Sequence, residues 1–124
     1  MRPVSTPKAP APAGHYSQGM VHAGLVHVSG MLPITPAGEK VDGPVEEQTR
    51  QALENVEAVL LAAGSSRDKV LSCTVYVADI GLWPRVNAAY AAFFGPHAPA
   101  RAVVPCPGLH HGLLVEIAAV AAVE

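Results

Sequence analysis

The chain has 124 residues, of which 50% are hydrophobic and 15% are charged, and its formal net charge is −2 at pH 7. This length allows one domain with a hydrophobic core and is too short for two. The slightly acidic balance excludes nucleic acid and anionic membranes as electrostatic partners. The low share of charged residues favours an oligomer that buries part of its surface.

The two cysteines, Cys73 and Cys106, form neither a disulfide framework nor a Cys-x-x-Cys pair, which favours reduced thiols and a cytoplasmic location. The N-terminal region lacks the apolar stretch of a signal peptide. The longest apolar run, which follows Gly112, is about half the length that spans a bilayer and contains Glu116. We therefore expect a soluble protein.

Residues 1–13 contain four prolines, which cannot sustain a sheet ladder or a helix. The sequence therefore predicts a flexible lead-in over 1–13, followed by one domain over 14–124. Short strands are expected over 16–21 and 25–29, because apolar and polar residues alternate in the second of them. A loop follows over 31–43.

The clearest helix covers 44–63, with Pro44 in its first turn and Gly64 at its C-terminal cap. A strand over 70–78 and a second helix from the N-cap Asp79 to about residue 94 come next. The last strands cover 101–104 and 113–122, and Pro105 should end the first of them or confine it to a sheet edge. The order ββαβαββ predicts an α+β fold with both helices on one face of a mixed sheet.

Arg101 opens one of these strands, and Glu116 is a lone carboxylate inside the apolar final strand. An unpaired buried charge costs several kcal/mol, so such groups are usually paired or used. One interpretation is an ion pair that ties two strands together. The other is a pocket in which Arg101 holds an anionic substrate while Glu116 handles a proton. Spacing alone does not separate these two interpretations.

Six fragments resemble the RidA (YjgF) family in order and spacing, and together they span nearly all of the chain after residue 13. They are Tyr16-Ser17-Gln18-Gly19, Val28-Ser29-Gly30, the segment 48–56, the segment 86–94, Pro99-Ala100-Arg101 and Val115-Glu116-Ile117. The resemblance implies a chorismate mutase-like α+β protomer that assembles as a homotrimer. In such a trimer the sheets form an inner barrel, and three clefts lie between neighbouring subunits.

The resemblance also implies an activity, the cofactor-free hydrolysis of reactive enamines and imines such as 2-aminoacrylate to a 2-keto acid and ammonia. Arg101 matches the family arginine, whose planar fork can bind a substrate carboxylate through two parallel hydrogen bonds. Glu116 matches the family glutamate, which would orient or activate the attacking water.

Tyr16, Ser29, Gly30 and Asn87 match pocket residues of the family, and Tyr16, Ser29 and Asn87 each have a simpler interpretation. Tyr16 could be a core aromatic, and Ser29 could be an ordinary turn serine. Gly30 would let its backbone approach a ligand closely because it has no Cβ. Asn87 is unfavourable in mid-helix, which indicates a specific hydrogen bond to a ligand or to a neighbouring loop.

The chain departs from the family pattern at Val103, where a cysteine is common, and at His110-His111-Gly112, which replaces a more polar turn. We therefore expect the substrate to differ through Val103 and the two histidines. The six histidines do not repeat a zinc-ligand spacing, so the sequence predicts no metal.

Two further hypotheses stay open. The protein could hold a small carboxylate or metabolite on the same scaffold without turnover, or it could be a deaminase confined to one pathway.

Overall fold

The computed structural model describes residues 1–124. Its two helices are α1 (Val45–Ala62) and α2 (Trp83–Phe94). Its strands are β1 (Arg2–Val4), β2 (Gly19–His22), β3 (Leu25–Met31), β4 (Val70–Val77), β5 (Ala100–Pro105) and β6 (Val115–Ala122). Three short 3-10 turns are η1 (Arg67–Lys69), η2 (Ile80–Leu82) and η3 (His110–Gly112).

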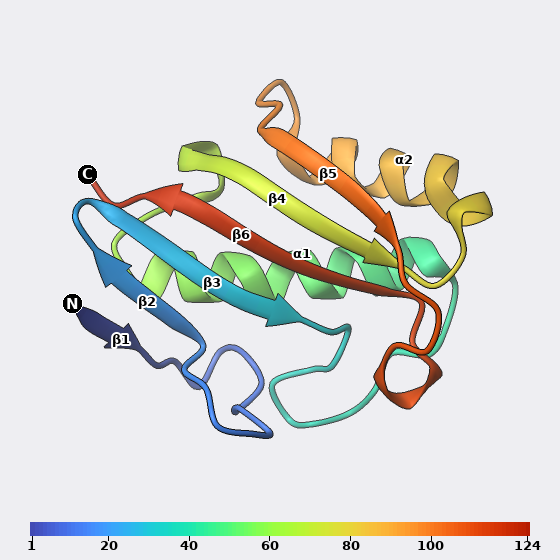
Figure 1. Cartoon of the computed structure of the whole chain (residues 1–124), viewed down its shortest axis with the longest axis horizontal. Helices are drawn as coiled ribbons and strands as arrows, with labels where there is room; N and C mark the ends of the chain where they lie inside the picture. The colour runs from blue at the N-terminus through green and yellow to red at the C-terminus, as the bar shows by residue number, and fades with distance from the viewer.

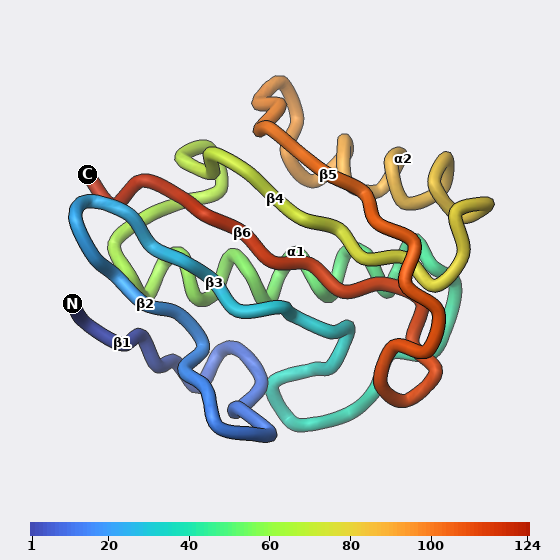
Figure 2. The backbone as a smooth tube through the Cα atoms, viewed as in Figure 1, coloured from blue at the N-terminus to red at the C-terminus, as the bar shows by residue number.

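The six strands form one mixed sheet in the order β1-β2-β3-β6-β4-β5. Every neighbouring pair is antiparallel except β4 and β5, which are parallel and are joined through α2. Both helices lie behind the sheet (Figures 1 and 2). The predicted α+β fold with a mixed sheet and two helices on one face is therefore confirmed.

The hydrophobic core lies between the sheet and the helices. In β6, Val115 and Ile117 are buried toward the helices, while Glu116 between them points to the open face. Leu53 and Leu60 of α1 are fully buried against this layer. Burial of each such leucine stabilises the fold by about 2–3 kcal/mol, so the apolar stripe of α1 fixes the helix on the sheet. No helix is long and apolar enough to cross a membrane.

Helix boundaries follow the sequence signals closely, with one difference at Asp79. Pro44 precedes α1, and Gly64 follows it with φ +85°, a conformation that glycine adopts without strain. Asp79, expected to cap the second helix, instead accepts a hydrogen bond from the Gly81 amide and begins η2. Helix α2 starts only at Trp83 because this 3-10 turn comes first.

Strand β5 lies at one edge of the sheet and ends at Pro105, as the proline signals predict. The opposite edge corrects the prediction that prolines exclude residues 1–13 from the ladder. Strand β1 pairs with β2, and Pro3 lies opposite Met20. Proline is tolerated there because β1 is the outermost strand, so a missing N–H need not interrupt the sheet.

Gln18 fixes the rest of this N-terminal segment. Its side chain is 3% exposed; the carbonyl oxygen accepts from the Thr6 amide at 2.7 Å, and the amide nitrogen donates to the Thr6 and Pro10 carbonyls at 3.1 and 2.8 Å. A buried amide with both ends satisfied positions the backbone that it binds. Residues 6–10 are therefore fixed against the sheet.

Candidate functional site

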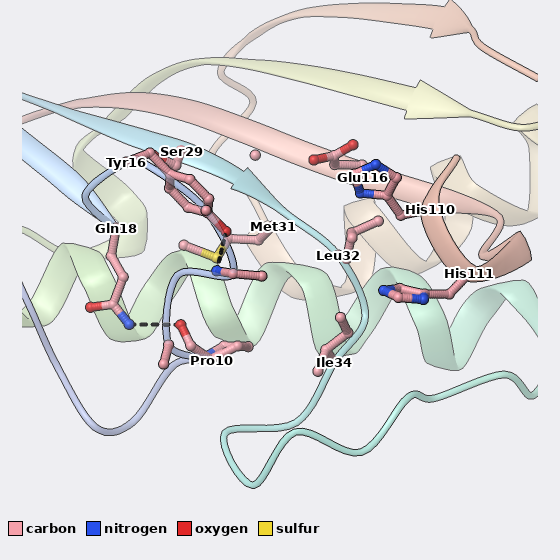
Figure 3. Close-up of a pocket in the computed structure, with 14 residues that line it drawn as sticks. Pro10, Tyr16, Gln18, Ser29, Met31, Leu32, Ile34, His110, His111 and Glu116 are labelled. Carbon is pink, nitrogen blue, oxygen red and sulfur yellow. Dashed lines mark hydrogen bonds between the residues drawn. The ribbon is translucent and has the colours of Figure 1, made fainter. Parts of the chain in front are cut away.

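One pocket of about 470 Å³ is lined by residues of three loops and of two strands. Its walls come from the N-terminal segment, from the loop after β3 and from η3, while β3 and β6 supply its floor. The pocket brings together four of the predicted site residues, Tyr16, Ser29, Gly30 and Glu116 (Figure 3).

Glu116 approaches the backbone of Gly30 very closely. The register between β3 and β6 shifts between Val28 and Met31, which is a β-bulge at the predicted site. A Cβ added to Gly30 would lie 2.6 Å from Glu116 Oε2. Glycine is needed here so that the Glu116 carboxylate can lie against the strand. This carboxylate forms no ion pair within the chain.

The two hydroxyl groups of the pocket differ in their surroundings. Tyr16 is 50% exposed, and its hydroxyl accepts a 3.3 Å hydrogen bond from the Ala13 amide, so the core-aromatic interpretation is wrong. Ser29 donates its hydroxyl proton to the Ser17 carbonyl at 2.6 Å. It therefore holds the neighbouring backbone and keeps its oxygen as an acceptor within the pocket.

Arg101 and Asn87 form a second group, away from this pocket. Arg101 donates a 2.9 Å hydrogen bond from a terminal guanidinium nitrogen to Asn87 Oδ1, and its guanidinium carbon lies 4.7 Å from the centre of the Tyr90 ring. The Trp83 ring centre is 5.7 Å away. Arg101 has no carboxylate partner, whereas Arg50, Arg67 and Arg85 are each paired with a glutamate.

The charge of Arg101 is not balanced by its titratable neighbours. Burial is the main cause that raises the pKa of the Cys73 thiol and of the Tyr90 hydroxyl. Both groups stay protonated and neutral near pH 7. A positioned, unpaired guanidinium flanked by aromatic rings is a ready site for a carboxylate, because its remaining N–H groups keep their fork geometry.

Arg101 and Glu116 lie on opposite faces of the sheet. Arg101 is next to Cys73, which is buried toward the helices, while Glu116 is opposite Tyr76 on the open face. Strand β4 separates β5 from β6. The strand-tying ion pair is therefore excluded, and the two residues of one chain cannot contact the same small molecule.

The remaining predicted residues also have clear positions. Val103 lies two residues after Arg101 on the same face and packs against the core. His110 and His111 line the pocket with Glu116, at the position where the sequence predicts a difference in substrate. His111 has φ 62°, a left-handed conformation that is uncommon for a residue other than glycine. The structure contains no group of three or more His, Cys, Asp or Glu side chains arranged to hold a metal.

Two residues outside the predicted site also shape the pocket. Gln18 lies two residues after the predicted Tyr16, and its burial fixes one pocket wall. Asn55 donates hydrogen bonds to the Leu32 and Ile34 carbonyls at 3.1 and 2.8 Å, which fixes another wall. A polar residue inside the apolar stripe of a predicted helix was the signal that could have revealed Asn55.

Comparison with known proteins gives consistent matches over the whole fold. A family model described as Endoribonuclease L-PSP matches residues 6–123. A RutC family protein from Pyrococcus horikoshii is 41% identical over 119 residues, which cover 95% of this chain and 94% of the relative.

Two solved structures from Escherichia coli extend the comparison. The YjgF gene product has a TM-score of 0.95 at 35% identity over 100% of both chains. The TdcF protein with bound serine has a TM-score of 0.94 at 32% identity and covers 98% of each chain. The chain therefore belongs to the RidA (YjgF) family, whose model carries the description Endoribonuclease L-PSP.

Proposed function

We propose that the protein hydrolyses reactive 2-imino and 2-enamino acids to 2-keto acids and ammonia. The observation that carries this proposal is the pair Arg101 and Glu116, each without an ionic partner in its own chain. An unpaired cation can bind the substrate carboxylate, and an unpaired carboxylate can handle the protons of hydrolysis.

A complete site then needs two copies of the chain, because the two residues lie on opposite faces of the sheet. In the proposed homotrimer, the pocket of Tyr16, Ser29, Gly30 and Glu116 in one subunit meets Arg101 and Asn87 of the next. The half-exposed Tyr16 ring at the pocket supports a buried interface there, since a large exposed aromatic side chain is typical of contact surfaces.

The chemistry needs no cofactor. Arg101 fixes the carboxylate, and Glu116 takes a proton from water as the water oxygen attacks C2 of the nitrogen-protonated imine. The electron pair of the C=N bond moves to nitrogen, giving a neutral carbinolamine. Glu116 then returns its proton to the amino group, and the C–N bond breaks toward nitrogen. The hydroxyl proton passes to Glu116 as the keto oxygen forms, and the departing ammonia takes that proton and leaves as ammonium. An enamine enters after tautomerising to the imine.

The bound serine of the TdcF structure supports the proposal, because serine presents the same type of carboxylate on a two-carbon unit. Cleavage of RNA, which the family description names, is less favoured for this chain. Recognition of RNA depends on basic side chains free to meet phosphates. Here three of the arginines are already paired with glutamates, and the net charge is −2.

The test is the clearance of 2-iminopropanoate generated by an amino acid oxidase, with semicarbazide as the competing trap. The wild-type protein should lower semicarbazone formation, and Arg101→Ala should abolish this effect while the trimer persists in light scattering. Arg85→Ala, which removes an arginine paired outside the pocket, is the matched control and should keep full activity. If the wild-type protein removes 2-iminopropanoate no faster than buffer does, the proposed enzymatic activity is refuted.

The departures at Val103 and His110-His111 favour one alternative, a protein that binds a small carboxylate without turnover. Calorimetry with 2-ketobutyrate then gives binding that Arg101→Ala removes, while no imine is hydrolysed. If the wild-type protein degrades a labelled RNA and Glu116→Gln does not, the result would instead support a ribonuclease activity.

A further inference from the structure

The pocket around Glu116 has two chemically different ends. Figure 3 shows Tyr16 and Gln18 on one side, and Leu32, Ile34 and the two imidazole rings of the His110-His111 turn on the other. A volume of about 470 Å³ lies within the range of pockets that enclose sizeable ligands. A three-carbon imino acid held at Glu116 does not reach across this pocket to Leu32, Ile34 and the two histidines together, so a longer substrate side chain has lining residues to contact.

The His110-His111 turn keeps a strained backbone at this place. His111 adopts φ 62° and ψ 18°, which costs conformational energy for a residue with a Cβ. Strain of this kind persists where the surrounding structure imposes it, and it occurs most often at binding sites. The ring centres of His110 and His111 are 6.0 Å apart, and neither ring forms a hydrogen bond within the chain. Both residues are exposed and line the pocket, so their rings are accessible to a ligand.

Leu32 and Ile34 form the apolar part of the same wall, and their backbone is held in place before any ligand binds. The Leu32 and Ile34 carbonyls both accept hydrogen bonds from the buried Asn55 side chain. With their backbone held in this way, the side chains of Leu32 and Ile34 line the pocket without needing to reorganise. A preformed apolar wall favours apolar groups because little order is lost on binding.

We propose that Leu32, Ile34, His110 and His111 form a subsite for the substrate side chain, and that the protein prefers 2-imino acids with large apolar or aromatic side chains over three-carbon ones. This inference rests on the proposed function for its turnover test, but the preference of the subsite is also measurable by binding alone. Leu32 and Ile34 supply apolar contact, and the imidazole rings supply flat faces for stacking.

The first experiment compares kcat/KM for imines generated from leucine, phenylalanine and alanine. In the wild-type protein, the leucine and phenylalanine imines should be favoured at least about ten-fold, since each methylene in a fitted apolar pocket is worth roughly that factor. His111→Asn keeps a residue that tolerates the left-handed backbone, and Ile34→Ser keeps the backbone contact with Asn55. Each variant should lower the preference by about five-fold or more while the alanine imine is still hydrolysed.

Ile80→Ser is the matched control, because Ile80 is 53% exposed and lies outside the pocket. It should leave the preference unchanged. The preference is the ratio of kcat/KM for the leucine or phenylalanine imine to kcat/KM for the alanine imine. A wild-type ratio of one or less overturns the proposed subsite. A ratio that neither His111→Asn nor Ile34→Ser reduces overturns it as well.

The second experiment measures binding of the corresponding keto acids, 4-methyl-2-oxopentanoate and pyruvate, by calorimetry. Tighter binding of the six-carbon acid, lost in His111→Asn, supports the subsite even if no imine is hydrolysed, in which case only the proposed function fails. Equal binding of both acids by wild type overturns the subsite, whatever the rate of hydrolysis.

Discussion

Replacing Gly30 with alanine should inactivate the protein without unfolding it. Gly30 does not have a positive φ, so alanine fits the backbone, and the only severe contact is the one between the new Cβ and Glu116 Oε2 at 2.6 Å. The carboxylate must retreat by roughly 0.8 Å to regain an ordinary contact of about 3.4 Å. Because it ends a flexible side chain, the free energy of unfolding should change by less than about 1 kcal/mol.

The effect on catalysis should be much larger. A displacement of about 1 Å in a catalytic group can cost a factor of about 100. We therefore expect kcat/KM for 2-iminopropanoate to fall about 100-fold in Gly30→Ala, a loss of about 2.7 kcal/mol of transition-state stabilisation. The semicarbazide assay measures this loss, and thermal unfolding checks that Tm moves by less than about 4 °C.

Gly43 offers a matched control, because a Cβ there would lie 3.0 Å from the Glu47 carboxylate, outside the pocket. Gly43→Ala should keep full activity. Glu116→Asp shortens the carboxylate side chain, so its effect should be smaller in the Gly30→Ala background than in wild type. Gly30→Ala with unchanged Tm and more than about half of the wild-type kcat/KM would refute the role of the Glu116 position.

Three further predictions concern the framework. Asn55→Ala leaves the Leu32 and Ile34 carbonyls without their donor, and urea denaturation should show a loss of about 2–3 kcal/mol; an unchanged midpoint would contradict this role. Arg67→Lys cannot reproduce the two hydrogen bonds to Glu57, so the same measurement should show a loss of about 1–2 kcal/mol, whereas equal stability would mean that charge alone suffices. The Arg85 hydrogen bond lowers the pKa of Glu46 to about 2. That contribution is complete above about pH 4.5 and is lost as the pH falls toward 2, so Tm of wild type should fall more steeply over this range than Tm of Arg85→Met; parallel curves would show that the pair contributes nothing.

Local signals were sufficient to predict most elements of the fold. Helix α1 carries its own start and stop residues, Pro44 and Gly64, and a continuous apolar stripe. The proline at position 105 correctly placed β5 at an edge. Strand β1 was missed because Pro3 argues against a strand when read by itself, and only its outermost position makes it acceptable.

The sequence predicts the geometry of the candidate site less completely than it predicts the fold. The charges of Arg101 and Glu116 within apolar strands, together with the family fragments, identify both residues, but the sequence does not reveal that these side chains leave the sheet on opposite faces. That relation depends on strand order, because β4 separates β5 from β6 and sets which residues share a face. Strand order is a property of the whole sheet and leaves no mark on the local pattern of either strand.

Buried carboxamide side chains hold the three pocket walls through backbone atoms in or next to those walls. Gln18 holds the N-terminal wall, Asn55 holds the loop after β3, and Gln48 accepts from the Leu114 amide just beyond η3. None of these anchoring bonds involves a wall side chain, so the lining residues can be exchanged while the loops keep their course. Because the anchoring residues are separate from the lining residues, substitutions in the lining can change which ligands the pocket binds while the fold stays intact. Relatives with this fold can therefore diverge in ligand preference one lining residue at a time.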